Sequence, residues 1–217
     1  GPLLEREGIQ IGIVGKIAAP AAFRVRLEGE GGHAGAVLMP DRHDASLAAA
    51  EVALAVESAA KESGSPDTVG TTGVFRIEPG AINSVPARAL LEIDLRDTDL
   101  SARNRAEERI REAVAASCEK RGVRYEWQVI NSDPPAICDA QLVETIESCA
   151  AGLGFSNRRM ISRAYHDALF MARIAPTAMI FIPCRNGWSH RPDEYASPEA
   201  IDAGVSVLAA ALRRTTG

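Results

Sequence analysis

The chain has 217 residues, of which 46% are hydrophobic and 24% charged, and its net charge is -5. These proportions are ordinary for a globular protein that buries a sizeable core in one large or two small domains. No cluster of Lys and Arg is interleaved with aromatic residues, so we expect no nucleic-acid partner. No apolar run reaches the roughly 18 residues that a membrane helix needs, so we expect no membrane partner.

The cysteines indicate a compartment. Four of them are widely spaced and form no CxxC pair: Cys118, Cys138, Cys149 and Cys184. This pattern is typical of reduced thiols and does not suggest a metal-thiolate site. We therefore expect a cytoplasmic protein.

Six segments follow one another in an order that indicates a known unit. They are a strand over 23–29, a helix over 44–61, strands over 68–77 and 89–95, a helix from about 99 to 121, and a strand over 124–130. The order β-α-β-β-α-β is typical of the ferredoxin-like split unit, an antiparallel sheet with two helices on one face. The sequence therefore predicts a ferredoxin-like domain over residues 21–130.

The flanking segments have a different pattern. A strand over 9–18 precedes the ferredoxin-like domain. After it come a helix over 139–153, a short helix over 166–173, an apolar run over 177–183 and a last helix from about 197 to 213. The apolar run is typical of a strand buried on both faces. These elements predict part of an α/β layer, and they are too few to cover a parallel sheet. We assign residues 1–20 and 131–217 to this incomplete unit.

Three of the four histidines lie where metal or acid–base chemistry is often built, beside glycines or carboxylates. His190 follows the apolar run, close to Asp193 and Glu194, and is either a metal ligand or a surface histidine. His166 opens a short helix and is either a substrate donor or a structural group. His33 lies among glycines, in either a site of close backbone approach or a flexible hairpin. The surroundings of His190 and His166 alone favour the structural interpretation.

Two further polar residues are candidates. Asn83 is either a turn residue or a substrate contact. Arg96 ends a strand, and its guanidinium suits a substrate carboxylate, although a surface ion pair with a neighbouring Asp explains it better on local sequence alone. The chain has neither a Gly-rich phosphate loop nor a G-x-S-x-G elbow, so nothing in it indicates a serine nucleophile.

Five segments occur in a fixed order, with 50 residues from His33 to Asn83 and 13 from Asn83 to Arg96. They are Gly1-Pro2-Leu3-Leu4-Glu5, His33-Ala34-Gly35, Ile82-Asn83-Ser84-Val85-Pro86 with Asp94-Leu95-Arg96, His166-Asp167-Ala168, and Ser189-His190-Arg191-Pro192-Asp193-Glu194. In these segments the chain resembles the dimeric metallo-amidohydrolases of the peptidase M20 superfamily, in its hydantoinase/carbamoylase branch. The resemblance covers essentially all 217 residues.

The resemblance implies an α/β fold in which a ferredoxin-like βαββαβ lid/dimerisation domain, residues 21–130, is inserted in an incomplete α/β metallohydrolase catalytic domain. Residues 1–20 and 131–217 would be the C-terminal share of that catalytic domain. We expect the N-terminal catalytic half, with most metal ligands and the general-base Glu, to be missing from this chain, which begins without Met. The chain alone would then be inactive.

The resemblance also implies site residues. His190 would bind metal, and His33, reaching across from the partner subunit of a homodimer, would stabilise the oxyanion. Arg96 would clamp the substrate carboxylate with Asn83 beside it, and Tyr165 and His166 would bind the polar part next to the ureido group. The implied cofactors are two divalent metal ions, manganese first, with zinc, cobalt or nickel as alternatives.

The form Ser162-Arg163-Ala164-Tyr165-His166-Asp167 resembles ureidoglycolate amidohydrolases of purine catabolism. The implied activity is metal-dependent hydrolysis of the ureido C–N bond of a small ureido acid, releasing ammonia and CO2. An N-carbamoyl-L-amino-acid hydrolase and an allantoate amidohydrolase are the alternatives within this class. A non-catalytic dimerisation module is the alternative of another class.

Overall fold

The computed structural model describes residues 2–216, which divide into two compact units. One unit is continuous and spans Ala19–Pro135. The other is built from two segments, one that ends at Ala18 and one that begins at Ala136. The sequence predicts boundaries after residues 20 and 130, and the two compact units divide after Ala18 and Pro135.

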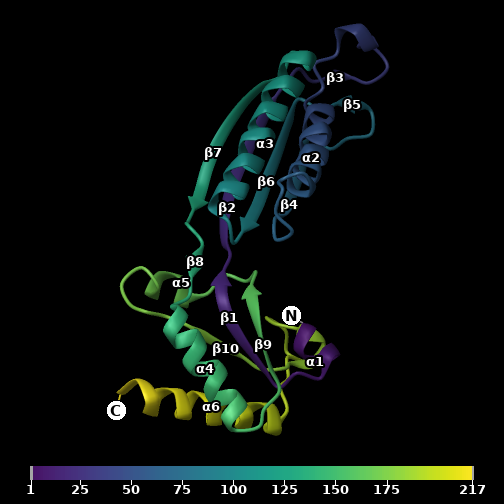
Figure 1. Ribbon diagram of the computed structural model, residues 1–217. Coiled ribbons are helices and arrows are strands. Elements are labelled where there is room, and N and C mark those ends of the chain that lie inside the picture. The colour runs from purple at the N-terminus through teal and green to yellow at the C-terminus, as the bar shows by residue number, and fades with distance from the viewer. Residues whose placement is uncertain (1, 217) are drawn as a thin grey trace. The chain divides into compact units, whose positions relative to one another are not determined.

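The continuous unit has the ferredoxin-like order. Its main elements are β2 (Ala19–Glu28), α2 (Ala45–Lys61), β4 (Val69–Glu78), β6 (Arg88–Asp97), α3 (Leu100–Arg121) and β7 (Arg124–Ser132). The strands form one sheet in the order β4-β6-β2-β7, and each neighbouring pair is antiparallel. Helices α2 and α3 lie side by side on one face of this sheet (Figure 1). The predicted fold class is confirmed.

Strict alternation in the strands explains this packing. Phe23, Val25 and Leu27 of β2 are buried against the helices, and the residues between them face the other side of the sheet. That other face is charged, since Arg24 pairs with Glu92 across the sheet at 2.5 Å. A single apolar face therefore positions both helices, and the opposite face stays polar.

Helix ends follow signals in the sequence. Asp44 caps α2 by accepting the backbone N–H of Ser46 at 2.8 Å, and Asp99 caps α3 in the same way through Ser101 and Ala102. Helix α3 ends at Gly122, whose φ of 62° lies in the left-handed region that glycine favours. Local capping thus places both predicted helices within one or two residues of their observed bounds.

Three short elements of this unit lay outside the sequence prediction. They are the paired strands β3 (Gly32–His33) and β5 (Ser84–Val85), and the 3-10 helix η1 (Met39–Asp41). Strands of two residues show no periodicity, so the sequence could not indicate them.

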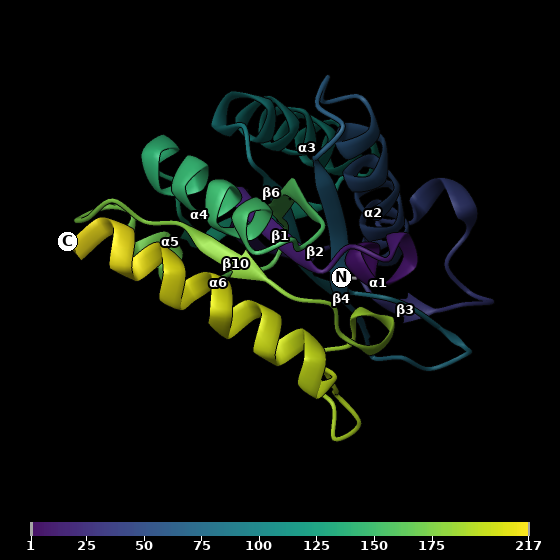
Figure 2. The ribbon, with the colours of Figure 1, turned by 60° about the horizontal axis from the view of Figure 1, so that its bottom comes forward.

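The two-segment unit contains a small mixed sheet. Strand β1 (Ile11–Ile17) pairs in parallel with β9 (Asn157–Ser162), and antiparallel with β10 (Met179–Phe181) and β8 (Ala136–Ile137). The helices are α1 (Leu3–Glu7), α4 (Ala140–Gly152), α5 (Asp167–Met171) and α6 (Pro198–Thr216), and η2 (Arg185–Gly187) is a 3-10 turn. Figure 2 shows α6 running alongside β10 and α4.

Two expectations for this unit need correction. The run over 177–183 was expected to be a strand buried on both faces, but β10 has three residues and each is only partly buried. Strand β9 was not predicted, because Arg158 and Arg159 interrupt its apolar pattern; Arg159 pairs outward with Glu147 at 2.5 Å. Among residues 2–216, no helix is both long and apolar enough to cross a membrane.

Candidate functional site

The structure brings His33 and Asn83 together, although 50 residues separate them. Strands β3 and β5 pair with His33 opposite Ser84, and the backbone N–H of Ala34 donates to the carbonyl oxygen of Asn83 at 2.8 Å. Two loops that each carry a predicted site residue therefore form one structure (Figure 1).

The loop fixes the chemistry of the His33 ring. The backbone N–H of Gly35 donates to His33 Nδ1 at 3.1 Å, so Nδ1 is an acceptor and the neutral ring carries its proton on Nε2. Arg42 supports the same loop, because its guanidinium donates to the carbonyl oxygens of Ala34 at 2.5 Å and of Val37 at 3.1 Å. His33 is exposed and offers Nε2–H as a hydrogen-bond donor.

Arg96 lies in the four-stranded sheet, near the end of β6 that is far from the β3–β5 pair. It pairs in register with Pro20 at the start of β2, whereas Arg88, at the start of β6, pairs with Glu28 at the end of β2. Eight residues of strand separate Arg88 from Arg96, which corresponds to roughly 26 Å. The expectation that Asn83 lies beside Arg96 therefore does not hold within one chain.

Arg96 already has a carboxylate partner. Its guanidinium donates to both carboxylate oxygens of Asp94, at 2.7 and 2.9 Å. These bonds raise the pKa of Arg96 above its usual range, against the opposing effect of burial. The surface ion pair considered from the sequence is thus present, and a substrate carboxylate would compete with Asp94 for the guanidinium.

The two-segment unit contains a cavity of about 760 Å³ that collects several polar side chains. It lies where β9 and β10 lead into loops, and His166, Ser162, Cys184, Ser189 and Glu194 are among its lining residues. The segments around His166 and His190, far apart in sequence, therefore border the same space.

His166 is a partly buried neutral donor or acceptor. Its Nε2 lies 2.8 Å from the hydroxyl oxygen of Ser162, and its ring centroid lies 5.6 Å from that of Phe181. Burial lowers the pKa of His166 below its ordinary value, and the charge of Asp167 only partly opposes this. His166 is therefore uncharged at neutral pH.

Tyr165 does not accompany His166 into the cavity. Its ring packs edge-on against Phe170, with centroids 5.5 Å apart. Among the described residues that line the cavity, His166 is included and Tyr165 is not. The two neighbours, expected to bind one polar group together, point to different surroundings.

His190 lies in a compact exposed loop. Its φ of 58° is in the left-handed region, and its backbone N–H donates to Glu194 at 3.2 Å. Arg191 lies 3.9 Å from the Trp188 ring centroid and pairs with Asp193 at 2.9 Å. The carboxylates of Asp193 and Glu194 therefore already have hydrogen-bond partners within this loop.

Within residues 2–216, no group of three or more His, Cys, Asp or Glu side chains gathers to hold a metal ion. A zinc-like site needs about four donors, and two ions need more. The donor set of this chain alone therefore does not fit the two implied metal ions.

Ser162 belongs to the candidate site, although the sequence predicts no role for it. Its hydroxyl is buried, with the side chain only 2% exposed, and it contacts the ring of His166. A serine four residues before a histidine could have drawn attention, but only the turn after β9 brings the two side chains together.

These features define an α/β chain with a ferredoxin-like unit, and comparison with known proteins identifies its class. The sequence matches peptidase family M20/M25/M40 over residues 1–214, and the chain belongs to this family.

Its relatives include ureidoglycolate hydrolases and N-carbamoyl-L-amino-acid amidohydrolases. The chain is 55% identical over 215 residues to a ureidoglycolate hydrolase of Oryza sativa subsp. japonica, covering 99% of this chain and 44% of that protein. It is 38% identical over 208 residues to an N-carbamoyl-L-amino-acid amidohydrolase of Pseudomonas sp. (strain NS671), covering 96% of this chain and 50% of that protein. The chain thus spans about half the length of the curated relatives it matches.

Solved structures similar to this chain come from the same group of proteins as its sequence relatives. The crystal structure of AtUAH in complex with glyoxylate has a TM-score of 0.90 and 53% identity, over 99% of this chain and 51% of that one. An amidase of the hydantoinase/carbamoylase family from Burkholderia multivorans has a TM-score of 0.90 and 32% identity, over 98% of this chain and 51% of that one. The predicted branch of the family is confirmed.

Proposed function

We propose that this chain is the C-terminal part of a metal-dependent amidohydrolase that cleaves the ureido C–N bond of ureidoglycolate, releasing ammonia and CO2 in purine catabolism. The observation that carries this proposal is graded identity. The chain is 55% and 54% identical to two ureidoglycolate hydrolases, but 38% to a carbamoylase and 32% to an allantoate amidohydrolase.

The chain's own residues supply binding and orientation. Arg96 binds the substrate carboxylate in bidentate fashion, the geometry it already has with Asp94 at 2.7 and 2.9 Å. His33 donates Nε2–H to the developing oxyanion, with Asn83 beside it in the same loop pair. His166 hydrogen-bonds the polar part of the substrate, and Tyr165 supports its segment from outside the cavity.

The metal ions depend on residues beyond this chain. His190 would contribute one imidazole ligand to a pair of divalent ions, manganese first, and the chemistry that such ions would supply is a lowered pKa of a bound water. The remaining donors belong to the other half of the catalytic domain, which the relatives' greater length supports. The positive φ of 58° at His190 is consistent with a loop shaped to aim one side chain.

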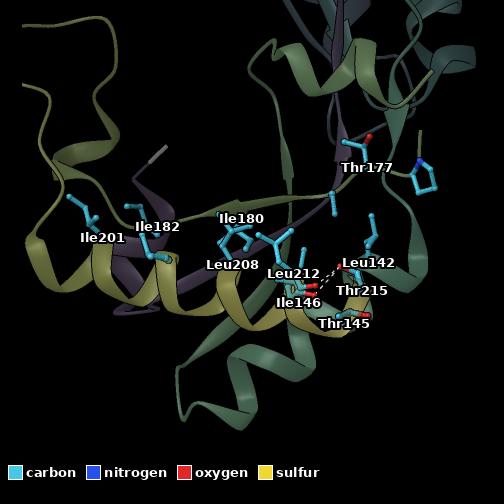
Figure 3. A pocket seen from close by; sticks show the side chains of 15 residues that line it. Leu142, Thr145, Ile146, Thr177, Ile180, Ile182, Ile201, Leu208, Leu212 and Thr215 are labelled. Carbon is cyan, nitrogen blue, oxygen red and sulfur yellow. Dashed lines mark hydrogen bonds between the residues drawn. The ribbon is translucent and has the colours of Figure 1, made fainter. Parts of the chain in front are cut away.

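The same missing half explains an apolar groove of about 540 Å³ in the two-segment unit. Figure 3 shows side chains from α4, β10 and α6 converging on it, among them Leu142, Ile180 and Leu208. Along α6, Val205 is 60% exposed and Leu212 is 53% exposed. Such a surface is typical of one that another layer of the same domain covers.

The geometry of the ferredoxin-like unit supports a homodimer in which this unit acts as lid and dimerisation domain. His33 and Asn83 lie on the β3–β5 pair, beyond one end of the four-stranded sheet, and Arg96 lies near its other end, so one chain cannot bring all three to one substrate. Two copies can, if each active site takes His33 and Asn83 from one protomer and Arg96 from its partner. Edge strand β4 exposes Phe75 and Ile77, which supports pairing between copies.

We place this enzyme in the cytoplasm. Its four cysteines are free thiols, three of them buried. Burial raises the pKa of Cys118 to about 11, so this thiol stays protonated and inert. Reduced cysteines of this kind are typical of cytoplasmic proteins.

A substrate panel tests the proposal. The intact enzyme, loaded with Mn²⁺, is assayed for ammonia release from ureidoglycolate, N-carbamoyl-L-amino acids and allantoate. We expect the highest kcat/KM with ureidoglycolate, and faster turnover of either alternative would overturn the choice of substrate.

The His190→Ala variant tests the metal assignment in the same experiment. We expect loss of bound metal by elemental analysis and loss of activity. The His43→Ala variant is the control for metal content, because His43 lies in the ferredoxin-like unit, where its ring hydrogen-bonds the carbonyl oxygen of Arg121 at 3.0 Å. Unchanged metal content in the His190→Ala variant would contradict its role as a ligand. No ureidolytic activity in an intact, metal-loaded protein would favour the non-catalytic dimerisation module.

A further inference from the structure

The hydroxyl of Ser162 makes three close polar contacts. Its oxygen lies 2.8 Å from His166 Nε2 and 3.2 Å from the carbonyl oxygen of Ala164, and it accepts the backbone N–H of Ala164 at 3.2 Å. A hydroxyl has one proton to donate, so it can serve only one of its two acceptor candidates at a time.

Distance decides where that proton goes. Hydrogen bonds donated by a hydroxyl are usually about 2.7–2.8 Å long and seldom exceed about 3.0 Å. The 2.8 Å contact to His166 Nε2 is within this range, whereas the 3.2 Å contact to the Ala164 carbonyl is beyond it. If Nε2–H donated to the hydroxyl oxygen instead, the hydroxyl proton would keep only the 3.2 Å contact to the carbonyl oxygen of Ala164. The better-satisfied arrangement is therefore a hydroxyl that donates to Nε2 while its oxygen accepts the backbone N–H of Ala164.

The consequence lies on the other ring nitrogen. A neutral imidazole carries one proton, so an Nε2 that accepts from Ser162 leaves the proton on Nδ1. Burial holds the ring neutral, since it lowers the pKa of His166. His166 lines the cavity and has only Nδ1 left for a ligand there.

We propose that Ser162 is a positioning residue that locks His166 in the Nδ1–H tautomer, so that the ring donates one hydrogen bond to an oxygen acceptor bound in the cavity. The acceptor is a carbonyl, hydroxyl or carboxylate oxygen of the substrate. His166 then binds and orients this oxygen, and does not act as a general base through Nε2. The catalytic consequence rests on the proposed function, whereas the tautomer itself does not.

Nuclear magnetic resonance tests the tautomer directly. Histidine-selective ¹⁵N labelling of the intact protein distinguishes a protonated from a bare ring nitrogen, and this chain contributes four histidines to the spectrum. A His166→Gln variant assigns the signals. We expect Nδ1 protonated and Nε2 bare in the wild type, and a shift toward Nε2–H in Ser162→Ala. The Ser162→Thr variant keeps the hydroxyl and should restore the wild-type pattern.

The Ser117→Ala variant is the matched control, because it removes another buried hydroxyl, 8% exposed, in the ferredoxin-like unit. It should leave the His166 signals unchanged. Protonated Nε2 in the wild type, or an unchanged tautomer in Ser162→Ala, would overturn the inference. A shift that Ser117→Ala reproduces would also overturn it, since the effect would then be general.

Kinetics separates this inference from the proposed function. In the intact enzyme, we expect Ser162→Ala to lower kcat/KM for ureidoglycolate about tenfold, and Ser162→Thr to recover most of it. A wild type that has the Nδ1–H tautomer but hydrolyses no ureido substrate would leave the positioning role intact and refute the proposed function. An active wild type whose rate is unaffected in Ser162→Ala would refute the positioning role in catalysis.

Discussion

Glu51 on α2 shows how single charges join the two helices of the ferredoxin-like unit. Its carboxylate accepts hydrogen bonds from Arg121 at 2.5 Å and from Lys120 at 3.1 Å, both at the end of α3. The bond from Arg121 is the main reason that the pKa of Glu51 falls to about 2, although burial opposes it. The ion pair therefore connects helix α2 to the last turn of α3, where cations also suit the helix dipole.

This pair predicts a pH dependence of stability. The folded pKa of about 2 lies below the ordinary value of 4.5, so the contribution of Glu51 is full above pH 4.5 and is lost as the pH falls toward 2. Because the ion pair is partly exposed, we expect Glu51→Gln to lower the free energy of unfolding by only about 1 kcal/mol at pH 7. Urea unfolding of both proteins at several pH values measures this. The unfolding free energies of the wild type and of Glu51→Gln should converge near pH 2.

The neighbouring Glu119 offers a control for this measurement. It is exposed on the same turn of α3 as Lys120. Glu119→Gln should change the unfolding free energy less than Glu51→Gln does at pH 7. A constant difference between Glu51→Gln and wild type from pH 7 to pH 2 would contradict the assigned cause.

At the scale of elements, capping decides where α2 begins. The carboxylate of Asp44 accepts the backbone N–H of Ser46 at 2.8 Å and its hydroxyl at 2.6 Å. Asp44 is only 9% exposed, so water replaces it poorly. We expect Asp44→Ala to lower the unfolding free energy by about 1 kcal/mol, and Asp44→Asn, which keeps a capping oxygen, to lower it less. Urea unfolding measures both variants. If Asp44→Ala and Asp44→Asn lose the same unfolding free energy, the charge of Asp44 stabilises the helix and its capping oxygen does not.

The same scale shows what the sequence could predict. Alternation and caps such as Asp44 and Asp99 are local signals, so the six main elements of the ferredoxin-like unit were found close to their observed bounds. Strand β9 was missed because Arg158 and Arg159 break its apolar pattern, and β10 was expected to be buried because hydropathy does not report which layers cover a strand. Local pattern therefore predicts elements well and their burial less well.

In the candidate site too, some features are visible in the local sequence and others depend on tertiary structure. His33, His166 and His190 are predicted site residues because the motifs around them resemble those of the family, whereas the surroundings of His166 and His190 alone favour a structural role. The contact between Ser162 and His166 and the separation of Asn83 from Arg96 depend on the path of the chain through turns and strands. Only tertiary structure could indicate either.

At the scale of the whole molecule, the ends of the sheet determine which residues can share an active site. His33 and Asn83 lie at one end of the ferredoxin-like unit and Arg96 at the other. In the proposed dimer, each site takes Arg96 from one protomer and the other two residues from its partner. Each residue should supply roughly 2–4 kcal/mol of transition-state stabilisation, so His33→Ala and Arg96→Ala should each be nearly inactive alone.

Mixing these two variants tests the arrangement. After subunit exchange, about half of the dimers are mixed, and each mixed dimer has one site with both residues intact, so the mixture should regain about a quarter of wild-type activity. His33→Ala mixed with Asn83→Ala is the control: both residues come from the same protomer, so no intact site can form. Recovery in that control, or none in the first mixture despite exchange, would mean that the three residues do not meet across the dimer. If activity returns when His33→Ala is mixed with Arg96→Ala but not when it is mixed with Asn83→Ala, each active site must be built from residues of both subunits.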